Sequence, residues 1–196
     1  MPPRSPRQQQ PREPLVAGSS LLTATHLQDI VRALPTRLAI RDWRRLFSTA
    51  EDGCNLHTLY RRCRGEGPCV LVVRDSAGYL FGAFASGGIE LRPGEYLGTG
   101  ETFLMTWAPT FRAFTWTGVD SLFLVAEEGW MGFGGGKFGL WLDADLEKGK
   151  SRPSTTFGNA CLASTDDFFV EAVEVWGFTS FTSVQFRRSS STNSRR

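Results

Sequence analysis

The chain has 196 residues, 41% hydrophobic and 21% charged, with a formal net charge of +2, a composition typical of a globular protein of one or at most two domains. No stretch approaches the roughly 18 apolar residues of a membrane span. No apolar run follows the opening "MPPRSPRQQQPREP", so the sequence predicts neither a transmembrane segment nor a signal peptide.

Positive charge gathers at the two ends of the chain. A Pro/Gln-rich head and a Ser-rich tail together carry seven arginines: Arg4, Arg7, Arg12, Arg187, Arg188, Arg195 and Arg196. These exceed the net charge, so the middle of the chain is mildly acidic and is not expected to bind nucleic acid. We predict a disordered basic head over 1–18, one folded domain over 19–180 and a flexible tail over 181–196. Contact of the tails with RNA or acidic lipid is the alternative.

Two short helices are predicted in the first third of the chain. Thr25 and Gln28 form a capping-box pattern before an apolar stripe that ends at Pro35, with members Leu27, Ile30, Val31 and Leu34. A short strand is expected around Arg44–Ser48. Asn55 can cap a second helix, "LHTLYRRCR", on which His57 falls on the solvent side.

From Pro68 onward the pattern is that of strands separated by turns. Seven segments are predicted to be strands: 69–75, 79–86, 101–109, 111–118, 121–128, 137–145 and 168–178. Strands and helices do not alternate regularly, which argues against a doubly wound parallel sheet. The predicted fold is therefore α+β and mainly β, a two-sheet antiparallel β-sandwich with flanking short helices.

A glycine-rich stretch, "GWMGFGGGKFGLWLD", contains the pattern G-x-G-x-x-G with Lys137 inside it. A phosphate loop needs a helix after its glycines, because the helix N-terminus supplies the amides that hold the anion. Here the alternating "LWLD" follows, and Phe138 stands where a P-loop needs Ser or Thr. We therefore interpret Gly134, Gly135 and Gly136 as a tight turn and Gly139 as a strand position against which another segment packs.

Four successive blocks resemble the TLDc domain of the oxidation resistance family: "DWRRLFSTAEDGCNLHTLYRRC", "GPCVLVVRDSAGYLFGAF", "GTGETFLMTWAPTFRAFTWTG" with "SLFLV", and the segment from "GGGKFG" to "VEVWGF". They run in order from about residue 21 to 178. Each block is modest alone, but four in this order are specific. The chain looks like a short, nearly TLDc-only member.

The resemblance implies a non-catalytic interaction module rather than an enzyme. Family members protect against oxidative stress and bind the soluble sector of the vacuolar-type proton-pumping ATPase, altering its assembly or activity. A monomeric cytoplasmic protein, recruited to vacuolar or lysosomal membranes through the pump, is the corresponding expectation. No cofactor is implied.

Four carboxylates are the candidate functional or structural acidic residues. Glu101 lies at a strand start, and Asp143 and Asp145 close a strand two residues apart. Glu174 is expected to share a strand face with Val170, Ala172 and Trp176 and to be partly buried. Such groups either act as an acid or base with a shifted pKa, bind a cation, or cap backbone amides in a turn.

Thiols are the other candidates for chemistry. The chain has no C-x-x-C pair, so its four cysteines, Cys54, Cys63, Cys69 and Cys161, are expected to be reduced and to form neither a disulfide frame nor a zinc site. A peroxide-reducing cysteine needs a stabilised thiolate, whereas a buried structural thiol does not. A small enzyme using a carboxylate or a cysteine, and a lectin-like or peptide-binding sandwich, are the alternatives to the interaction module.

Overall fold

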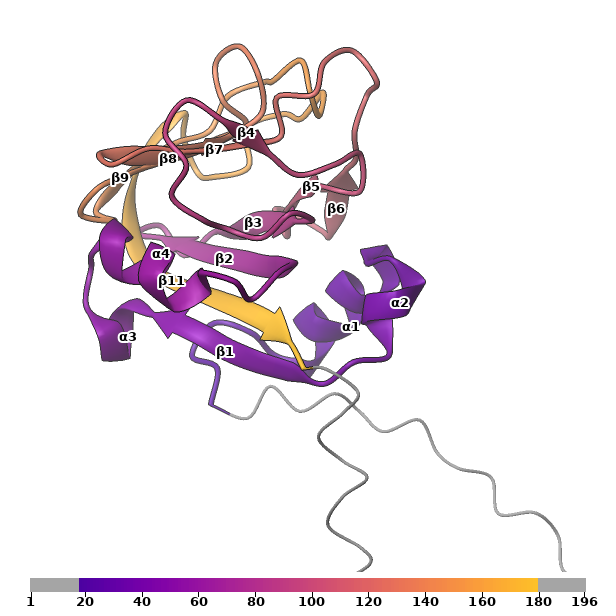
Figure 1. The fold of residues 1–196 in the computed structure, drawn as a ribbon, viewed down its shortest axis with the longest axis vertical. Coiled ribbons are helices and arrows are strands. Elements are labelled where there is room, and N and C mark those ends of the chain that lie inside the picture. The colour runs from indigo at the N-terminus through magenta and orange to yellow at the C-terminus, as the bar shows by residue number, and fades with distance from the viewer. Residues whose placement is uncertain (1–17, 180–196) are drawn as a thin grey trace, which may run out of the picture.

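A computed structural model describes residues 18–179 as two layers of antiparallel strands, with two helices on the outer face of one layer and further short helices at the side (Figure 1). The predictions for the head and the tail concern residues outside this range. Sheet A contains the strands β1 (Trp43–Ser48), β2 (Cys69–Asp75), β3 (Leu80–Ala85), β5 (Phe103–Thr106) and β6 (Arg112–Phe114). Sheet B contains β4 (Tyr96–Leu97), β7 (Leu124–Ala126), β8 (Trp130–Phe133), β9 (Leu140–Asp143) and β10 (Lys148–Lys150). The predicted sandwich is confirmed.

One long strand joins the two sheets. β11 (Asp167–Phe178) pairs with β10 through its first residues and with both β1 and β2 through its later ones. The strand order is β4-β7-β8-β9-β10-β11-β2-β3-β5-β6. β1 lies outside this order and pairs with β11. The sandwich is therefore one continuous sheet folded over along β11.

Three strands were not predicted, because glycines and charged residues in and around them interrupt any alternating apolar pattern. β4, β8 and β10 have only two, four and three residues. β8 includes Gly132, and β10 is the Lys-Gly-Lys stretch that returns from β9. Such strands form because a partner strand supplies their hydrogen bonds, which is a tertiary effect.

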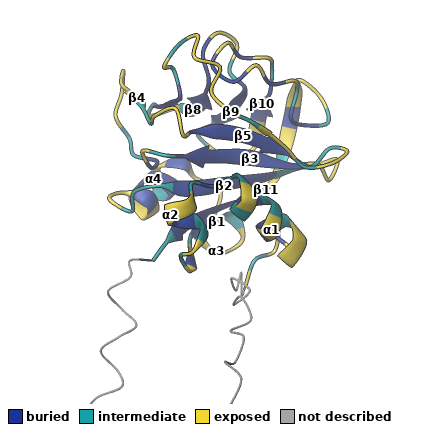
Figure 2. Ribbon diagram, turned by 90° about the vertical axis from the view of Figure 1, so that its right-hand side faces the viewer, coloured by how far each residue is buried: buried dark blue, intermediate teal, exposed yellow. Residues whose placement is uncertain are grey.

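The main core fills the space between the sheets. Side chains from β2 and β3 of sheet A meet side chains from β7, β8 and β9 of sheet B, and all of them are buried. A second core lies on the outer face of sheet A, beneath α1 (Ala24–Ala33) and α2 (Thr36–Ala39). Figure 2 shows this arrangement, with dark-blue strands stacked between the loops above and the exposed outer surfaces of α1 and α2 below.

The helices differ from expectation mainly at their starts. Thr23, not Thr25, caps α1: its Oγ1 accepts from the His26 amide at 3.3 Å, while His26 Nδ1 accepts from the Thr23 amide at 3.3 Å. Both threonines precede the apolar stripe, and the local pattern does not distinguish them. The predicted cap of α4 (Leu56–Cys63) is confirmed, since Asn55 Oδ1 accepts from the Thr58 amide at 3.0 Å. A further four-residue helix, α3 (Thr49–Asp52), follows β1.

A β-bulge alters the faces of β11. Val170 pairs with Asp75 and Ala172 with Arg74, so Glu171 is an extra residue. An extra residue reverses the side-chain alternation beyond it. Val170 consequently packs against the main core, whereas Ala172 packs against the second core. The expectation that Glu174 shares a face with Val170 is therefore wrong.

Candidate functional site

The glycine-rich stretch forms a turn between two strands of sheet B. Gly134 and Gly136 have φ of 87° and 78°, a region that favours glycine. β9 follows the turn, so no helix N-terminus is present there to hold a phosphate. The Gly135 amide donates to Thr156 Oγ1 at 2.7 Å, which ties the turn to the loop after β10.

Gly139 lies immediately before β9 rather than within it. A Cβ built on this residue would lie 2.7 Å from Asn159 Oδ1 and would also collide with the buried side chain of Leu104. Close packing therefore accounts for Gly139. Lys137 is exposed at the tip of the same turn.

Glu174 is fully buried and accepts four hydrogen bonds. Oε1 accepts from the Ser20 amide at 2.8 Å and from Ser20 Oγ at 2.9 Å. Oε2 accepts from Ser19 Oγ at 2.6 Å and from Trp176 Nε1 at 3.0 Å. The carboxylate thus fastens the segment before α1 to β11, more than 150 residues later, and is not bonded to a glycine turn.

Glu101 lies on the surface and forms a two-pronged ion pair with Arg37 of α2. The hydrogen bonds and charge of the Arg37 guanidinium hold the pKa of Glu101 below its usual value. The carboxylate therefore stays ionised and engaged, whereas a general acid or base needs a pKa near the working pH.

Asp143 and Asp145 do not form a pair on one strand face. β9 ends at Asp143, whose Oδ1 accepts from the amides of Glu147 and Lys148 at 2.9 and 3.1 Å. Asp145 is exposed in the turn that follows. Among residues 18–179 no three His, Cys, Asp or Glu side chains gather closely enough to hold a metal ion. Asp143 therefore has the geometry of a turn cap.

Burial keeps three of the four cysteines from being reactive thiolates. It raises the pKa of Cys63 to about 12, with a smaller contribution from Glu66. Burial also raises the pKa of Cys69 well above its ordinary value and raises that of the half-exposed Cys161. A peroxide-reducing cysteine needs the opposite environment, one that stabilises the thiolate. Cys54 is the exposed thiol.

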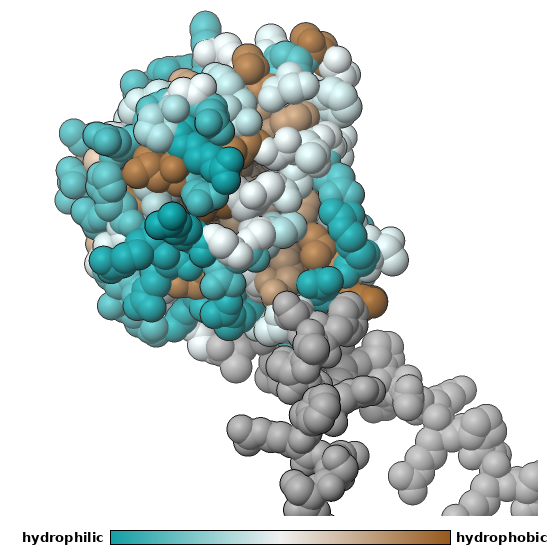
Figure 3. All heavy atoms as spheres, in the orientation of Figure 1, coloured by the Kyte–Doolittle hydropathy of each residue, from teal (hydrophilic) through white to brown (hydrophobic). Residues whose placement is uncertain are grey.

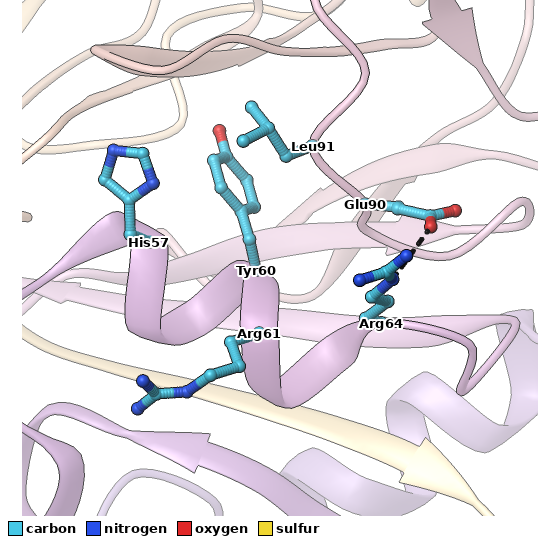
Figure 4. A pocket seen from close by; sticks show the side chains of 6 residues that line it. All are labelled: His57, Tyr60, Arg61, Arg64, Glu90 and Leu91. Atoms are coloured by element: carbon cyan, nitrogen blue, oxygen red, sulfur yellow. Dashed lines mark ion pairs between the residues drawn. The ribbon is translucent and has the colours of Figure 1, made fainter.

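The pocket beside α4 was not predicted from the sequence. The pocket, of about 350 Å³, is lined by His57, Tyr60, Arg61, Arg64, Glu90 and Leu91 (Figure 4). Figure 4 shows His57 and Tyr60 pointing to the same side of the helix, toward Leu91, while Arg64 approaches Glu90 at 3.7 Å. The helical spacing of His57, Arg61 and Arg64 was the available signal, since i, i+4 and i+7 share one face.

The chemistry of this pocket suits recognition rather than catalysis. The Tyr60 hydroxyl lies 3.0 and 3.2 Å from the carbonyl oxygens of Glu127 and Trp130, to which it donates, and burial raises its pKa. A neutral phenol whose proton is engaged is a poor base. Arg61 makes no hydrogen bond or ion pair within the described part of the chain, so it is available to a carboxylate of a partner.

A second hollow, of about 520 Å³, lies where α1 meets the tips of two hairpins. It is lined by His26, Gly78, Tyr79, Leu80, Trp107, Ala108 and Pro109, and we call it the aromatic groove. The aromatic groove was not predictable from the sequence, because its aromatic residues come from three separate segments. Figure 3 shows the face of Figure 1, where hydrophobic residues form patches between hydrophilic side chains.

The family model of the TLDc domain matches residues 15–179, a range that includes every described helix and strand. The chain belongs to the TLDc domain family. It is 42% identical over 163 residues to nuclear receptor coactivator 7 of Homo sapiens and 40% identical over 163 residues to oxidation resistance protein 1 of Homo sapiens. Oxidation resistance protein 1 of Xenopus tropicalis is 42% identical over the same length.

These matches cover 82% of this chain but only 17–19% of each relative. The chain thus spans less than a fifth of the length of these curated relatives. What is shared is the TLDc domain itself. Within residues 18–179 no helix has the length and apolar character needed to cross a bilayer.

Proposed function

We propose that this TLDc domain is a non-catalytic interaction module that contributes to oxidative-stress resistance by binding the soluble sector of the vacuolar-type proton-pumping ATPase. One observation carries the proposal: the family match spans all described elements, while three of the four candidate acidic residues, Glu101, Asp143 and Glu174, are each engaged in structural bonds. The name of one group of relatives, oxidation resistance protein 1, supports the stress-related part.

A rigid scaffold with exposed loops suits docking. Buried strands fix the positions of the loops at the glycine-rich end and of the helix α4 beside its pocket. Binding surfaces on such scaffolds change little when the partner arrives. Arg61 and its neighbours on α4 offer one charged contact to a partner, and surface charges of this kind steer association.

The test is a pull-down with the purified soluble sector of the pump, followed by measurement of its ATP hydrolysis. We expect the intact chain to be retained by the sector and to change the rate of hydrolysis. Arg61→Glu should weaken retention if α4 contributes, and Arg32→Glu, an exposed charge reversal on α1, is the matched control. Lack of retention of the folded protein would contradict the proposal.

A peroxide assay separates the module from the enzyme alternative. The purified chain should not consume hydrogen peroxide in the presence of a thiol reductant, because burial keeps Cys63 and Cys69 protonated. Turnover that disappears in Cys161→Ser or Cys63→Ser would instead establish a thiol enzyme. The candidate carboxylates do not favour hydrolytic chemistry, since Glu101 is paired with Arg37 and Glu174 accepts four structural hydrogen bonds.

A further inference from the structure

The aromatic groove is a preorganised surface of stacked rings. The His26 and Trp107 ring centroids lie 5.1 Å apart, and those of Trp107 and Phe111 lie 5.2 Å apart. Trp107 Nε1 donates to Asp29 Oδ2 at 3.1 Å, which fixes the indole in position. Tyr79, 41% exposed at the tip of the β2–β3 hairpin, stands over the same hollow. A fixed indole with neighbouring rings is typical of surfaces that bind proline-rich segments.

The chain carries a matching ligand in its own head. Residues 1–17, which lie outside the described part, contain P-x-x-P twice, as Pro3-Arg4-Ser5-Pro6 and as Pro11-Arg12-Glu13-Pro14. Segments of this type favour the extended polyproline conformation and dock on aromatic-lined grooves at low entropic cost. Three arginines against one glutamate give the head a positive charge, but Asp29 beside the groove already accepts from Trp107 and pairs with Arg32, so the prolines rather than charge carry the match. Arg32 approaches the other Asp29 oxygen at 3.6 Å with an exposed side chain.

The attachment point of the head lies close enough for this contact. Ser19 and Ser20 are fastened to Glu174, so the head leaves the domain at Gly18. His26, at one side of the groove, is eight residues further along and therefore at most roughly 29 Å away. A head of seventeen residues reaches roughly 50 Å when extended. The farther P-x-x-P segment, Pro3 to Pro6, therefore reaches the groove even at this upper limit.

We propose that the proline-rich head binds the aromatic groove of its own domain, with prolines against Trp107 and Tyr79. Covalent attachment raises the effective concentration of the head to the millimolar range. Even a weak contact is then populated, and the bound head covers the groove against a proline-rich segment of another protein.

The intact chain, labelled with 5-fluorotryptophan, provides the test by ¹⁹F NMR. Trp107→Phe assigns the Trp107 resonance. The decisive comparison is between the native chain and a variant in which Pro3, Pro6, Pro11 and Pro14 are replaced by Ala. We expect the Trp107 resonance to differ between the two chains. Trp116, which is exposed but does not line the groove, should give the same resonance in both.

A synthetic peptide of residues 1–17 completes the test. It should return the Trp107 resonance of the Pro→Ala variant toward the native position, and the native chain should need about tenfold more peptide for any response. Tyr79→Ser, which removes an exposed ring without touching the backbone bonds of its turn, should abolish the response.

Three outcomes would overturn the proposal. Identical Trp107 resonances in the native and Pro→Ala chains would show that the head does not occupy the groove. A difference that grows with protein concentration would assign the contact to a second copy of the chain. Equal peptide affinity of the two chains would leave the groove open and assign it to a proline-rich segment of a different protein.

Discussion

Replacing Glu174 by glutamine keeps the shape of a buried side chain but exchanges one carboxylate oxygen for an NH₂ group. Of the two hydroxyl partners, Ser20 can rotate and accept from that group, whereas Ser19 Oγ already accepts from the amides of Leu21 and Leu22. The two N–H partners cannot, and they lie on different oxygens: the Ser20 amide on Oε1 and Trp176 Nε1 on Oε2. Whichever way the amide turns, its NH₂ group faces an N–H donor.

The expected cost follows from the bonds that are lost. A hydrogen bond to a charged group contributes about 1.5–3 kcal/mol, and an unsatisfied buried donor costs about 1–3 kcal/mol. Partial relaxation reduces the sum, so Glu174→Gln should lower the free energy of unfolding by about 2–4 kcal/mol. For a domain of this size that corresponds to a fall in melting temperature of roughly 5–15 °C.

Urea unfolding followed by tryptophan fluorescence measures the change, with Glu171→Gln as the matched control. Glu171 lies three residues earlier on β11 and is 48% exposed, with an ion pair to Arg74 at 2.7 Å. Surface pairs of this kind contribute about 1 kcal/mol or less. Equal unfolding midpoints for Glu174→Gln and Glu171→Gln would refute the reasoning. An unchanged midpoint combined with lost pump binding would make Glu174 a functional residue.

Four further predictions concern packing and thiol chemistry. Gly139→Val should lower stability by about 1–3 kcal/mol because its side chain has no room, whereas Lys137→Ala should leave the melting temperature within experimental error. Trp176→Ala, at a side chain only 2% exposed, should cost about 3–5 kcal/mol and reduce soluble yield on expression. Burial raises the pKa of Cys63 in the folded state from the ordinary 9.0 to about 12. The contribution of the protonated thiol to stability is therefore present below pH 9. It is lost as the pH rises toward 12, because the unfolded chain releases the proton first. The urea midpoint should fall over this range, and less steeply in Cys63→Ala. Iodoacetamide with mass spectrometry at pH 8 should modify Cys54 and spare Cys63, and the reverse order would contradict the assigned burial.

The parts of the fold that depend on neighbouring residues were predictable from the sequence. The cap of α4 requires only an Asn side chain three residues before an amide, so Asn55 was identifiable. The strands β2 and β3 are β-branched or aromatic runs on either side of an Asp-Ser-Ala-Gly turn. A phosphate loop could also be excluded from the sequence, because the residues after Gly139 alternate as in a strand.

The contacts between distant segments could not be predicted in the same way. Glu174 was expected to be a partly buried carboxylate, but its partners Ser19 and Ser20 are more than 150 residues away. The aromatic groove joins His26 of α1 to Tyr79 and Trp107 of two hairpins. Neither association leaves a periodic pattern in the sequence, because each depends on how distant segments pack.

The sequence by itself determined the strand-rich composition, the capped helix α4 and the family to which the domain belongs, since these are carried by short-range patterns and by blocks in a fixed order. Tertiary structure decided the three short strands, the residue that caps α1 and the face on which Glu174 lies. The bulge at Glu171 illustrates the reason. One extra residue moves every side chain beyond it to the opposite face of the strand. The position of the bulge is set by pairing with β2, and the residues of β11 alone do not specify that pairing.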